Sequence, residues 1–393
     1  HLLSDSIENE RIQCPRRKAS GPPMSQAQHK PLRVLFLARR YPPTRGGAQT
    51  HAYKLSTYLS ARMPVTLVAL RQASIVHLAW YMPWAWLRAA IALILGRVDV
   101  VYFQDGVAAS LATALAPFRG RARFCCSLYG LEMTFGSRWA QALMKAGVRR
   151  CDGIAVISDN SIRIAEEAWG IPASRMRLIY LGAEPEELAP ARDAELREAF
   201  EQEHDISFEC DRVVLNLGRQ VTRKGVAAFV EQGLDLLDPD ITVLIVGGGP
   251  DADRIAAGRA QLETSGRVKI LGILDDDVCS MLRRHCGLFL MPNMATPGDV
   301  EGYGIAPLEA MYFGTPVVAF AVDALVEAVR EGGWLIAPGD YQAFADAVHS
   351  FFALSPEQRT QTGQQARDYC LREYGWDTTS ARYADLFQEL CTP

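Results

Sequence analysis

Two series of short apolar segments, separated by one polar stretch, constrain the fold of this 393-residue chain. The segments are rich in valine, isoleucine and leucine, and segments with helical spacing lie between them. Near-continuous apolar strands that alternate with helices are typical of parallel sheets covered on both faces. The predicted strands are at residues 34–38, 65–70, 98–103, 123–129, 153–158 and 176–182, then at 212–218, 241–247, 268–272, 287–292, 316–320 and 334–338.

The polar stretch between the two series, residues 184–211, is highly charged and contains two prolines, so we expect a linker there. The length suits two domains of about 150–200 residues each. The sequence therefore predicts an α/β fold with two Rossmann-like, doubly wound parallel-sheet domains facing a cleft, at residues 31–205 and 206–375. Residues 1–30 are polar, and we expect a disordered leader or tag there.

Composition narrows the functional classes. A net charge of −4 gives no broad attraction to nucleic acid. Nine cysteines are scattered without a CxxC pair, and several lie in apolar runs, which indicates buried thiols, a reducing cytoplasm and no structural zinc. Acidic clusters at 238–240 and 275–277 lie where a turn or a helix cap is expected, so we predict no metal site.

The most apolar stretch, residues 75–96, is interrupted by His77, Pro83 and Arg88. A membrane-spanning helix takes about 20 mainly apolar residues, so we do not expect this stretch to span a membrane. Two interpretations stay open: a surface helix packed on the first sheet, or a helix in a membrane interface. The second rests on the aromatic residues Trp80, Tyr81, Trp84 and Trp86.

In the first domain, Gly46 and Gly47 directly precede a predicted helix. Free amides at a helix start, with glycines that allow close approach, form an anion site, although the pair also suits a simple turn. His51 lies one turn into that helix, where a surface or packing role is favoured over contact with an acceptor.

In the second domain, "NLGRQVTRKG" follows the first strand and places Arg219 and Lys224 five residues apart across a turn. Both can converge on one anion, with Arg223 as a competitor and a solvated loop as the alternative. "IVGGGP" (245–250) follows the next strand and lets the backbone approach a ligand. It is neither a G-x-G-x-x-G fingerprint nor a P-loop, so a dehydrogenase or an ATPase gains little support.

"EGYGIAPLEAMYFG" (301–314) places Glu301 in the loop after a strand and Glu309 on the helix that follows. Pro307 suits the first turn of that helix, and Gly314 closes it. We expect both carboxylates at the ligand-facing rim, where they accept hydrogen bonds from sugar hydroxyls. Capping the helix is the structural alternative.

These motifs, with "ILGIL" (270–274) and "APGD" (337–340), resemble those of the retaining GT-B glycosyltransferases of family 4 over about residues 31–391. The resemblance implies a nucleotide-sugar donor, UDP- or GDP-linked, held mainly by the second domain, and no need for a metal. It also implies that residues 376–393 form a helix that crosses back onto the first domain.

Site roles follow from the same resemblance. Arg219 and Lys224 would hold the diphosphate, Glu301 the donor sugar hydroxyls and Glu309 the ribose. Gly47 would bring a helix dipole onto the phosphate. The remaining expected contacts are backbone and shape contacts, at Gly272, Ile273 and Leu274 for the base, and at Tyr303, Gly304 and Ile305 for the phosphate.

The implied mechanism needs no protein nucleophile. Negative charge grows on the leaving diphosphate as the anomeric bond breaks, and fixed cations and helix dipoles stabilise that transition state. The acceptor would attack on the leaving-group face, where a phosphate oxygen takes its proton. Configuration would then be retained.

Two positions depart from the family pattern. Tyr129 follows the fourth strand of the first domain, where the family commonly has a histidine near the reacting sugar, and tyrosine cannot be cationic. Ala324 stands where glycine is usual, so we expect a strained backbone with positive φ and altered phosphate geometry near Asp323.

The expected function is transfer of a hexose-type sugar to an acceptor of cell-surface glycan or glycolipid biosynthesis. The protein would be cytoplasmic, with or without peripheral attachment to an anionic membrane face. A soluble acceptor and a non-catalytic nucleotide-sugar binder are the alternatives. The membrane interpretation draws on residues 75–96 and on basic residues nearby in the sequence, Arg138, Lys145, Arg149 and Arg150.

Overall fold

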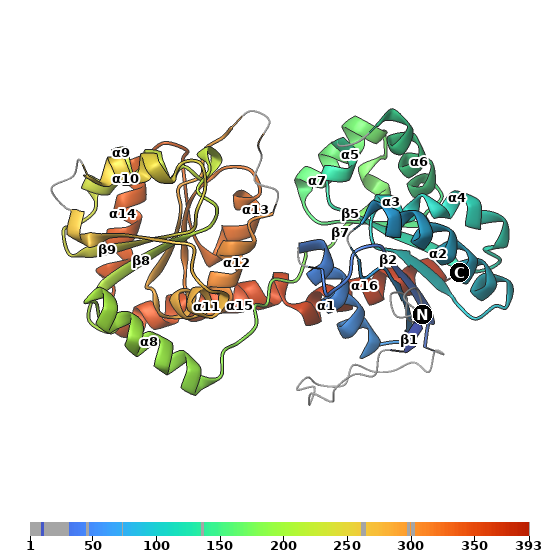
Figure 1. The fold of residues 1–393 in the computed structure, drawn as a ribbon, viewed down its shortest axis with the longest axis horizontal. Coiled ribbons are helices and arrows are strands. Elements are labelled where there is room, and N and C mark those ends of the chain that lie inside the picture. Colours follow the sequence, from blue (N-terminus) through green and yellow to red (C-terminus); the bar gives the residue numbers. More distant parts are fainter. Residues whose placement is uncertain are drawn as a thin grey trace. The chain divides into compact units, whose positions relative to one another are not determined.

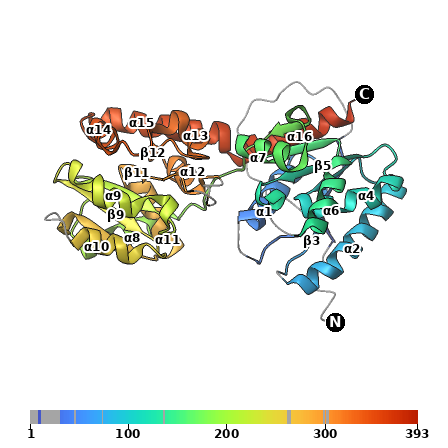
Figure 2. The same ribbon diagram turned by 90° about the horizontal axis from the view of Figure 1, so that it is seen from above.

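A computed structural model describes residues 9–11, 31–44, 47–72, 74–134, 137–260, 265–296, 299 and 303–392. The chain divides into two compact units. Unit 1 is His1–Gly182 with Trp376–Pro393, and unit 2 is Ala183–Gly375. Figures 1 and 2 show that each unit is a sheet with helices on both faces.

Unit 1 contains a parallel six-stranded sheet in the order β3-β2-β4-β5-β6-β7. A short strand, β1 (Asn9–Arg11), adds to its edge by pairing antiparallel with β3. Our expectation that residues 1–30 lie outside the fold is therefore wrong at 9–11. The six predicted strands are confirmed, with some shorter than expected, as β2 (Val34–Ala38), β3 (Val65–Ala69), β4 (Val100–Phe103), β5 (Arg123–Leu128), β6 (Gly153–Val156) and β7 (Met176–Leu178).

Alternate side chains of these strands enter two separate cores, because successive residues of a strand point to opposite faces. Leu35, Leu37 and Phe103 face one helical layer, whereas Val34 and Phe36 face the other. The first layer consists of α2 (Ile75–Ile94), α3 (Gly106–Ala109), α4 (Leu111–Leu115), η1 (Ala116–Phe118), α5 (Leu131–Thr134), α6 (Arg138–Arg149), α7 (Asp159–Ile164) and η2 (Ala165–Trp169). The second consists of α1 (Gly47–Ser60) and α16 (Trp376–Cys391).

The C-terminal helix α16 is part of the unit 1 core. Tyr383 and Phe387 are buried, and Tyr383 Oη lies 2.7 Å from Ser127 Oγ on β5. Thr379 donates to the backbone oxygen of Tyr180 at 3.0 Å. The C-terminal helix therefore completes the helical layer on one face of the sheet that the first part of the chain forms.

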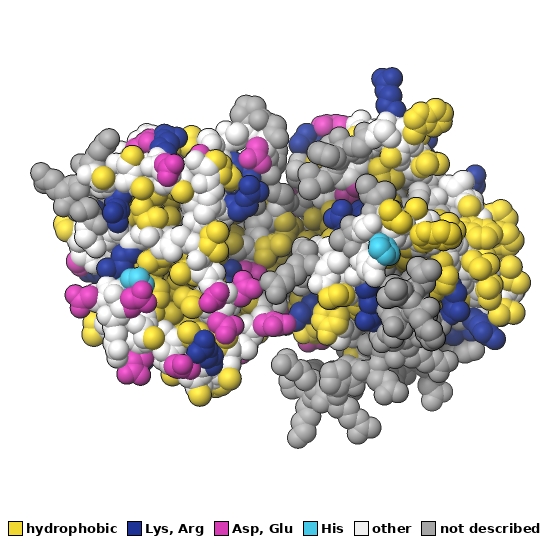
Figure 3. All heavy atoms as spheres, in the orientation of Figure 1, with side chains coloured by type: hydrophobic (Ala, Val, Ile, Leu, Met, Phe, Trp, Pro, Cys, Tyr) yellow, Lys and Arg dark blue, Asp and Glu magenta, His cyan; other side chains and the backbone are white. Residues whose placement is uncertain are grey.

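Helix α2 packs on the unit 1 sheet through Tyr81, Ala85 and Ala89, as the surface-helix interpretation predicted. No helix in the described part of the chain has the length and apolar composition needed to cross a bilayer. Figure 3 nevertheless shows hydrophobic side chains gathered at the surface on the right of the view, where Figure 1 places α2 and α4.

Unit 2 contains a parallel sheet in the order β10-β9-β8-β11-β12-β13. Its strands are β8 (Arg212–Leu217), β9 (Ile241–Val246), β10 (Val268–Gly272), β11 (Leu288–Met291), β12 (Val317–Phe320) and β13 (Gly333–Ile336). Its described helices are α8 (Pro190–His204), η4 (Thr222–Lys224), α9 (Val226–Gln232), η5 (Leu234–Leu236), α10 (Ala252–Ala260), η6 (Ser265–Arg267), α11 (Asp276–His285), α12 (Ile305–Tyr312), α13 (Leu325–Val329), η7 (Arg330–Gly332), α14 (Tyr341–Phe352) and α15 (Pro356–Tyr374). All six strands match the predicted ones, and the α/β fold class is confirmed.

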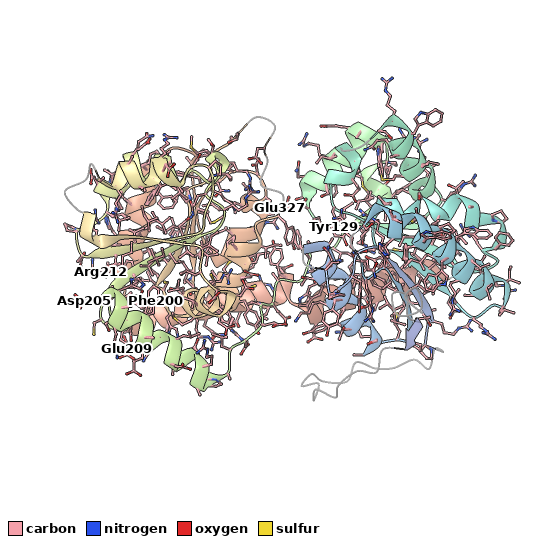
Figure 4. All side chains as sticks on the ribbon, in the orientation of Figure 1. Tyr129, Phe200, Asp205, Glu209, Arg212 and Glu327 are labelled. Atoms are coloured by element: carbon pink, nitrogen blue, oxygen red, sulfur yellow. The ribbon has the colours of Figure 1, made fainter. Side chains whose placement is uncertain are left out.

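The charged stretch 184–211 is not an extended linker. It contains α8, which buries Phe200 (Figure 4). This helix joins α11 through a 2.8 Å contact between Asp193 Oδ2 and His285 Nε2. The compact units consequently divide between Gly182 and Ala183, and not between residues 205 and 206 as we expected. Charge alone was a poor boundary signal, because part of it is paired within unit 2.

Each sheet reverses its strand order once. In unit 1, β3 and β4 lie on opposite sides of β2, and in unit 2, β9 and β11 lie on opposite sides of β8. Open parallel sheets bind ligands beyond the carboxyl ends of strands at such switch points. The loops after β2, β4 and β5 and after β8, β9 and β11 are therefore where a site is expected.

Candidate active site

The loop after β8 carries the two cations that the sequence predicted. Arg219 is exposed, two residues beyond the end of the strand. Lys224 ends the short η4 turn, and its Cε lies 3.9 Å from the position that a Cβ on Gly218 would occupy. The lysine stem thus folds back to the strand end, so both cations belong to one loop. Arg223, the predicted competitor, forms an ion pair with Asp299 at 3.0 Å.

Gly225 fixes the turn that carries Lys224. Its φ is +66°, and a Cβ there would lie 1.8 Å from the backbone oxygen of Pro292. The amide of Met294 also donates to the backbone oxygen of Arg223 at 2.9 Å. The turn is therefore pressed against the loop after β11, which leaves no room for a side chain at residue 225.

The three glycines after β9 serve mainly to join two loops. A Cβ on Gly247 would lie 2.0 Å from Gly218 O, and one on Gly249 would lie 2.1 Å from Gln220 O. The buried Gln220 side chain donates to Gly218 O at 3.0 Å and to Val246 O at 3.2 Å. The sequence predicts that these glycines let the backbone approach a ligand, and two of them also make room for the loop that holds Arg219.

The predicted base-binding loop, Gly272 to Leu274, adjoins the same edge of the sheet. Gly272 has φ +64° and accepts a backbone hydrogen bond from Gly247 at 2.6 Å. Ile273 is 84% exposed, and its Cγ1 and Cδ1 atoms lie 3.2 Å from where a Cβ on Gly248 would be. An isoleucine this exposed beside a glycine forms an apolar shelf at the strand ends.

Glu309 lies on α12 and is paired. Arg283 Nη2 on α11 contacts Glu309 Oε2 at 2.8 Å. Burial raises the pKa of Glu309, and the arginine opposes that shift. Sequence reasoning did not single out Arg283, since nothing in its local pattern distinguishes it from its neighbour Arg284. Any ligand that Glu309 binds shares this carboxylate with the arginine.

The start of α12 is only partly described. Glu301, which is predicted to contact the donor sugar, lies outside the described residues, as does Gly302. Gly304 has φ +71° and caps the helix, where a Cβ would lie 3.2 Å from Leu325 Cδ2. Tyr303 packs edge-on against Tyr374 with ring centroids 6.3 Å apart, and Ile305 is exposed.

Our expectation of strain at Ala324 is wrong. Ala324 has φ −65° and ψ −14°, an ordinary helical conformation at the start of α13. The left-handed residue is its neighbour Asp323, with φ +49°. Aspartate adopts this conformation more readily than most residues because its short polar side chain can bond locally. The turn is therefore compatible with alanine at 324.

Unit 1 places a polar cluster at the carboxyl ends of its central strands. Arg39 follows β2 and Asp105 follows β4, and Arg39 Nε lies 2.6 Å from Asp105 Oδ2. Gln104 donates to Ala48 O at 2.8 Å, which fixes the first turn of α1. None of these three side chains was predicted. Their positions in the sequence could have identified them, because each lies one or two residues beyond the end of a predicted strand.

Tyr129 follows β5 (Figure 4), and the charges of Asp105 and Arg39 act on its hydroxyl. Its hydroxyl lies 2.8 Å from His51 Nδ1 on α1, with the two rings edge to face. Burial lowers the pKa of His51 to about 3 and raises the pKa of Tyr129 well above its usual value, so both groups are neutral. His51 also packs beside Trp376 and Tyr383. Its role inside the fold is thus packing and hydrogen bonding.

Glu132 is the ionisable group of this cluster that titrates near neutrality. Its Oε1 accepts a hydrogen bond from the backbone amide of Tyr129 at 2.8 Å. Burial raises the pKa of Glu132 to about 7, that amide bond opposes the shift, and the charge of Asp105 adds to it. Sequence reasoning missed this residue because the shift comes from burial.

Gly47 is the first residue of α1 and is exposed. No atom of the described residues lies within 4 Å of where its Cβ would be. The helix start therefore has room in front of it. Gly46, which shares the predicted motif, lies outside the described residues.

Comparison with known proteins assigns this arrangement to a class. The family model "Glycosyltransferase Family 4" matches residues 45–187, and "Glycosyl transferases group 1" matches residues 198–369. Together the two matches cover most of the chain, with every strand of the unit 2 sheet and strands β3 to β7 of the unit 1 sheet. The protein is therefore a transferase of sugars. The chain belongs to the family 4 glycosyltransferases, whose two-domain architecture is called GT-B.

Relatives and solved structures agree with this assignment. The chain is 27% identical over 362 residues to the GDP-mannose-dependent alpha-(1-6)-phosphatidylinositol monomannoside mannosyltransferase of Mycolicibacterium smegmatis, covering 88% of each chain. It is 31% identical over 184 residues to the phosphatidyl-myo-inositol mannosyltransferase of Mycobacterium tuberculosis, covering 45% of this chain and 47% of that one. The crystal structure of Anabaena HepE with UDP has a TM-score of 0.65 and 21% identity, and covers 91% of this chain and 100% of that one, which shows the fold.

Proposed function

We propose that this protein is a retaining glycosyltransferase that moves a hexose-type sugar from a nucleoside diphosphate sugar to a glycolipid acceptor. The observation that carries the proposal is the loop after β8, where Arg219 and Lys224 share one strand end in a fold of this family. The name of one relative adds GDP-mannose as donor and a phosphatidylinositol monomannoside as acceptor, and the name of the second adds transfer of mannose to phosphatidyl-myo-inositol. GDP-mannose is accordingly the first donor to test, and UDP-sugars are the second.

The donor occupies the carboxyl edge of the unit 2 sheet. Arg219 and Lys224 hold the diphosphate, because guanidinium and ammonium groups are strong donors to phosphate oxygens. The Ile273 shelf receives one face of the nucleobase, with the adjoining backbone of Gly272 and Leu274. Glu309, oriented by Arg283, accepts from the ribose hydroxyls.

Catalysis then relies on cations that the fold holds in position before the reaction begins. The leaving diphosphate gains negative charge as the anomeric bond breaks, and the fixed cations stabilise that state more than the bound donor. The acceptor hydroxyl attacks on the face that the diphosphate leaves and gives its proton to a phosphate oxygen. The anomeric configuration is retained without a protein nucleophile.

Unit 1 contributes a neutral environment on the acceptor side. Tyr129 stands where the family commonly has a histidine, and its hydroxyl is held by His51. Its role is to orient one hydrogen bond, since neither group carries charge near neutral pH. Gly47 leaves the first turn of α1 open to a phosphate or a sugar.

The location that fits this acceptor is the cytoplasmic face of a membrane. Lipid-linked acceptors lie in the bilayer, so the enzyme has to meet that surface. A soluble acceptor is the alternative outcome, and transfer to sugar phosphates without lipid would establish it.

The test is transfer of labelled mannose from GDP-mannose to extracted phosphatidylinositol mannosides, with UDP-glucose as a second donor. Retention is read from the anomeric coupling constant of the product by NMR. We expect an α-linked product from the α-linked donor, with activity unchanged by EDTA. Tight nucleotide binding without nucleoside diphosphate release across a broad acceptor panel would instead identify a non-catalytic binder.

A further inference from the structure

Helix α2 has an apolar outer face. Six of its exposed residues follow one another at intervals of three or four, the spacing of a single helix face, and all six are apolar: Val76, Trp80, Pro83, Leu87, Ile91 and Ile94. Trp80 is 69% exposed and Ile94 is 65% exposed. A helix on the surface of a globular protein normally presents polar residues outward. The outer face of α2 therefore needs a partner.

Helix α6 also has exposed apolar side chains. These two helices lie over the same face of the sheet, and α4 contacts both of them. On α6, Trp139 is 83% exposed, and Leu143, one turn further on, is also exposed. Phe118 of η1 is exposed and touches Trp86 of α2 with ring centroids 6.0 Å apart. We call the outer faces of α2, η1 and α6 the apolar layer.

Charge identifies what covers this layer. Helices α2, α3, α4, η1 and α6 contain no aspartate or glutamate. Exposed arginines border it instead, at Arg97, Arg121, Arg138 and Arg150. Unit 1 as a whole has 25 lysines and arginines against 13 aspartates and glutamates, a net charge of +12.

We propose that the apolar layer inserts into the interface of an anionic lipid bilayer and holds unit 1 on the membrane. Interfacial helices lie in the membrane plane with tryptophan and aliphatic residues inserted and with cations near the headgroups, which is the composition of this layer. Attraction to anionic lipid contributes about a fivefold gain in binding for each cation near the surface. The inference rests on the proposed function and deepens it by naming the face that brings the enzyme to its lipid acceptor.

The test is sedimentation of the full chain with vesicles of phosphatidylcholine, with and without phosphatidylglycerol. We expect binding to the anionic vesicles at low salt, and weaker binding when salt is raised. The double variant Trp80→Ser/Ile94→Ser should lose at least about tenfold in partition coefficient, because two inserted apolar side chains are removed. The control is Tyr53→Ser, which removes an exposed aromatic residue of α1 on the other face of the sheet.

A second pair of variants tests the charge. Arg97→Gln/Arg121→Gln should reduce binding to anionic vesicles by about tenfold or more. Lys54→Gln/Arg382→Gln removes the same charge from α1 and α16 and should have a much smaller effect. A nucleotide-induced thermal shift equal to that of the wild type shows that each variant is folded.

Several results would overturn the proposal. One is a wild type that does not bind anionic vesicles at low salt, and another is a Trp80/Ile94 variant that binds as well as the wild type. A dimer that becomes a monomer in that variant, by analytical ultracentrifugation, would make the layer an interface between copies. Vesicle binding without sugar transfer would refute the proposed function and leave this surface standing, and transfer without vesicle binding would do the reverse.

Discussion

The two units share one architecture and use it in opposite ways. Unit 1 has a net charge of +12, whereas unit 2 carries 16 basic and 32 acidic residues, a net charge of −16. Yet the loop after β8 in the acidic unit presents the exposed Arg219, whereas in the basic unit Tyr129, half-buried at the end of β5, and His51, buried on α1, form a neutral pair. Local placement of charge at a strand end, and not the net charge of the unit, therefore decides which loops suit a diphosphate. Function lies in sites built on a fold, not in the fold itself.

The largest expected effect tests the cationic loop after β8. We expect Arg219→Ala to lower kcat/KM for sugar transfer by about 10²-fold, the scale for loss of one group that stabilises transition-state charge. Glu301→Gln should lower it by a similar factor. The control is Arg212→Ala at the other end of β8, which should stay within about twofold of the wild type, because a surface cation paired with Asp238 and Asp240 contributes little. Near-full activity of both Arg219→Ala and Glu301→Gln would show that the site is misplaced.

The next effect concerns Glu132, beside the neutral pair of unit 1. The folded-state pKa of this group, about 7, lies above its ordinary value, so the folded state holds a proton that the unfolded state releases. The contribution of Glu132 to stability is therefore greatest at low pH and falls as pH rises from about 4.5 to 7, by roughly 2–3 kcal/mol. Denaturant unfolding at pH 5 and pH 8 measures the difference.

Glu132→Gln is the matched control for that experiment. Glutamine keeps an oxygen that can accept from the amide of Tyr129 but does not titrate. Its stability should lose this part of the pH dependence. An equal pH dependence in the variant and the wild type would contradict the assignment to Glu132.

A smaller effect is expected when the hydrogen bond of the neutral pair is removed. Tyr129→Phe leaves His51 Nδ1 buried without that partner, which costs about 1 kcal/mol of unfolding free energy. Sugar transfer should fall far less than in Arg219→Ala. A loss of transfer as large as that of Arg219→Ala, with stability unchanged, would give Tyr129 a direct part in the chemistry and would break the contrast between the units.

The smallest effect concerns Ala324 in unit 2. Because Ala324 is helical, Ala324→Gly should lower stability by about 0.5–1 kcal/mol through the greater freedom of glycine in the unfolded chain. Donor affinity should be unchanged within about twofold. A gain in stability would mean that alanine is strained there, as the sequence pattern first suggested.

Much of the fold could be predicted because burial on both faces leaves a local record. Strands such as residues 34–38 and 268–272 were found to the residue, since parallel strands covered by helices are apolar throughout. The unit boundary was missed because Phe200 and Asp193 tie a charged helix to unit 2, and that tie is a long-range contact. The strand at residues 9–11 was missed for the same reason, since its partner is β3.

The site was predicted where a motif is local and missed where it is assembled. Arg219 and Lys224 stand in one short loop, so their spacing alone suggested a shared anion. Arg283 beside Glu309 and Arg39 beside Asp105 come from different elements, and no spacing predicts such pairs. The sequence marked the glycines at 247 and 249 but not their contacts with the loop after β8, because the atoms that approach them belong to that neighbouring loop.

By itself, the sequence determined the alternation of strands and helices, the doubly wound class and the identity of the cationic loop. These features depend on the chemistry of neighbouring residues, which the order of the chain states directly. Only the tertiary structure decided that Glu132 titrates near neutrality, that His51 is buried and neutral, and that one face of α2 remains apolar and uncovered. Each of these depends on which distant atoms exclude water from a side chain, and burial is a property of the packed fold.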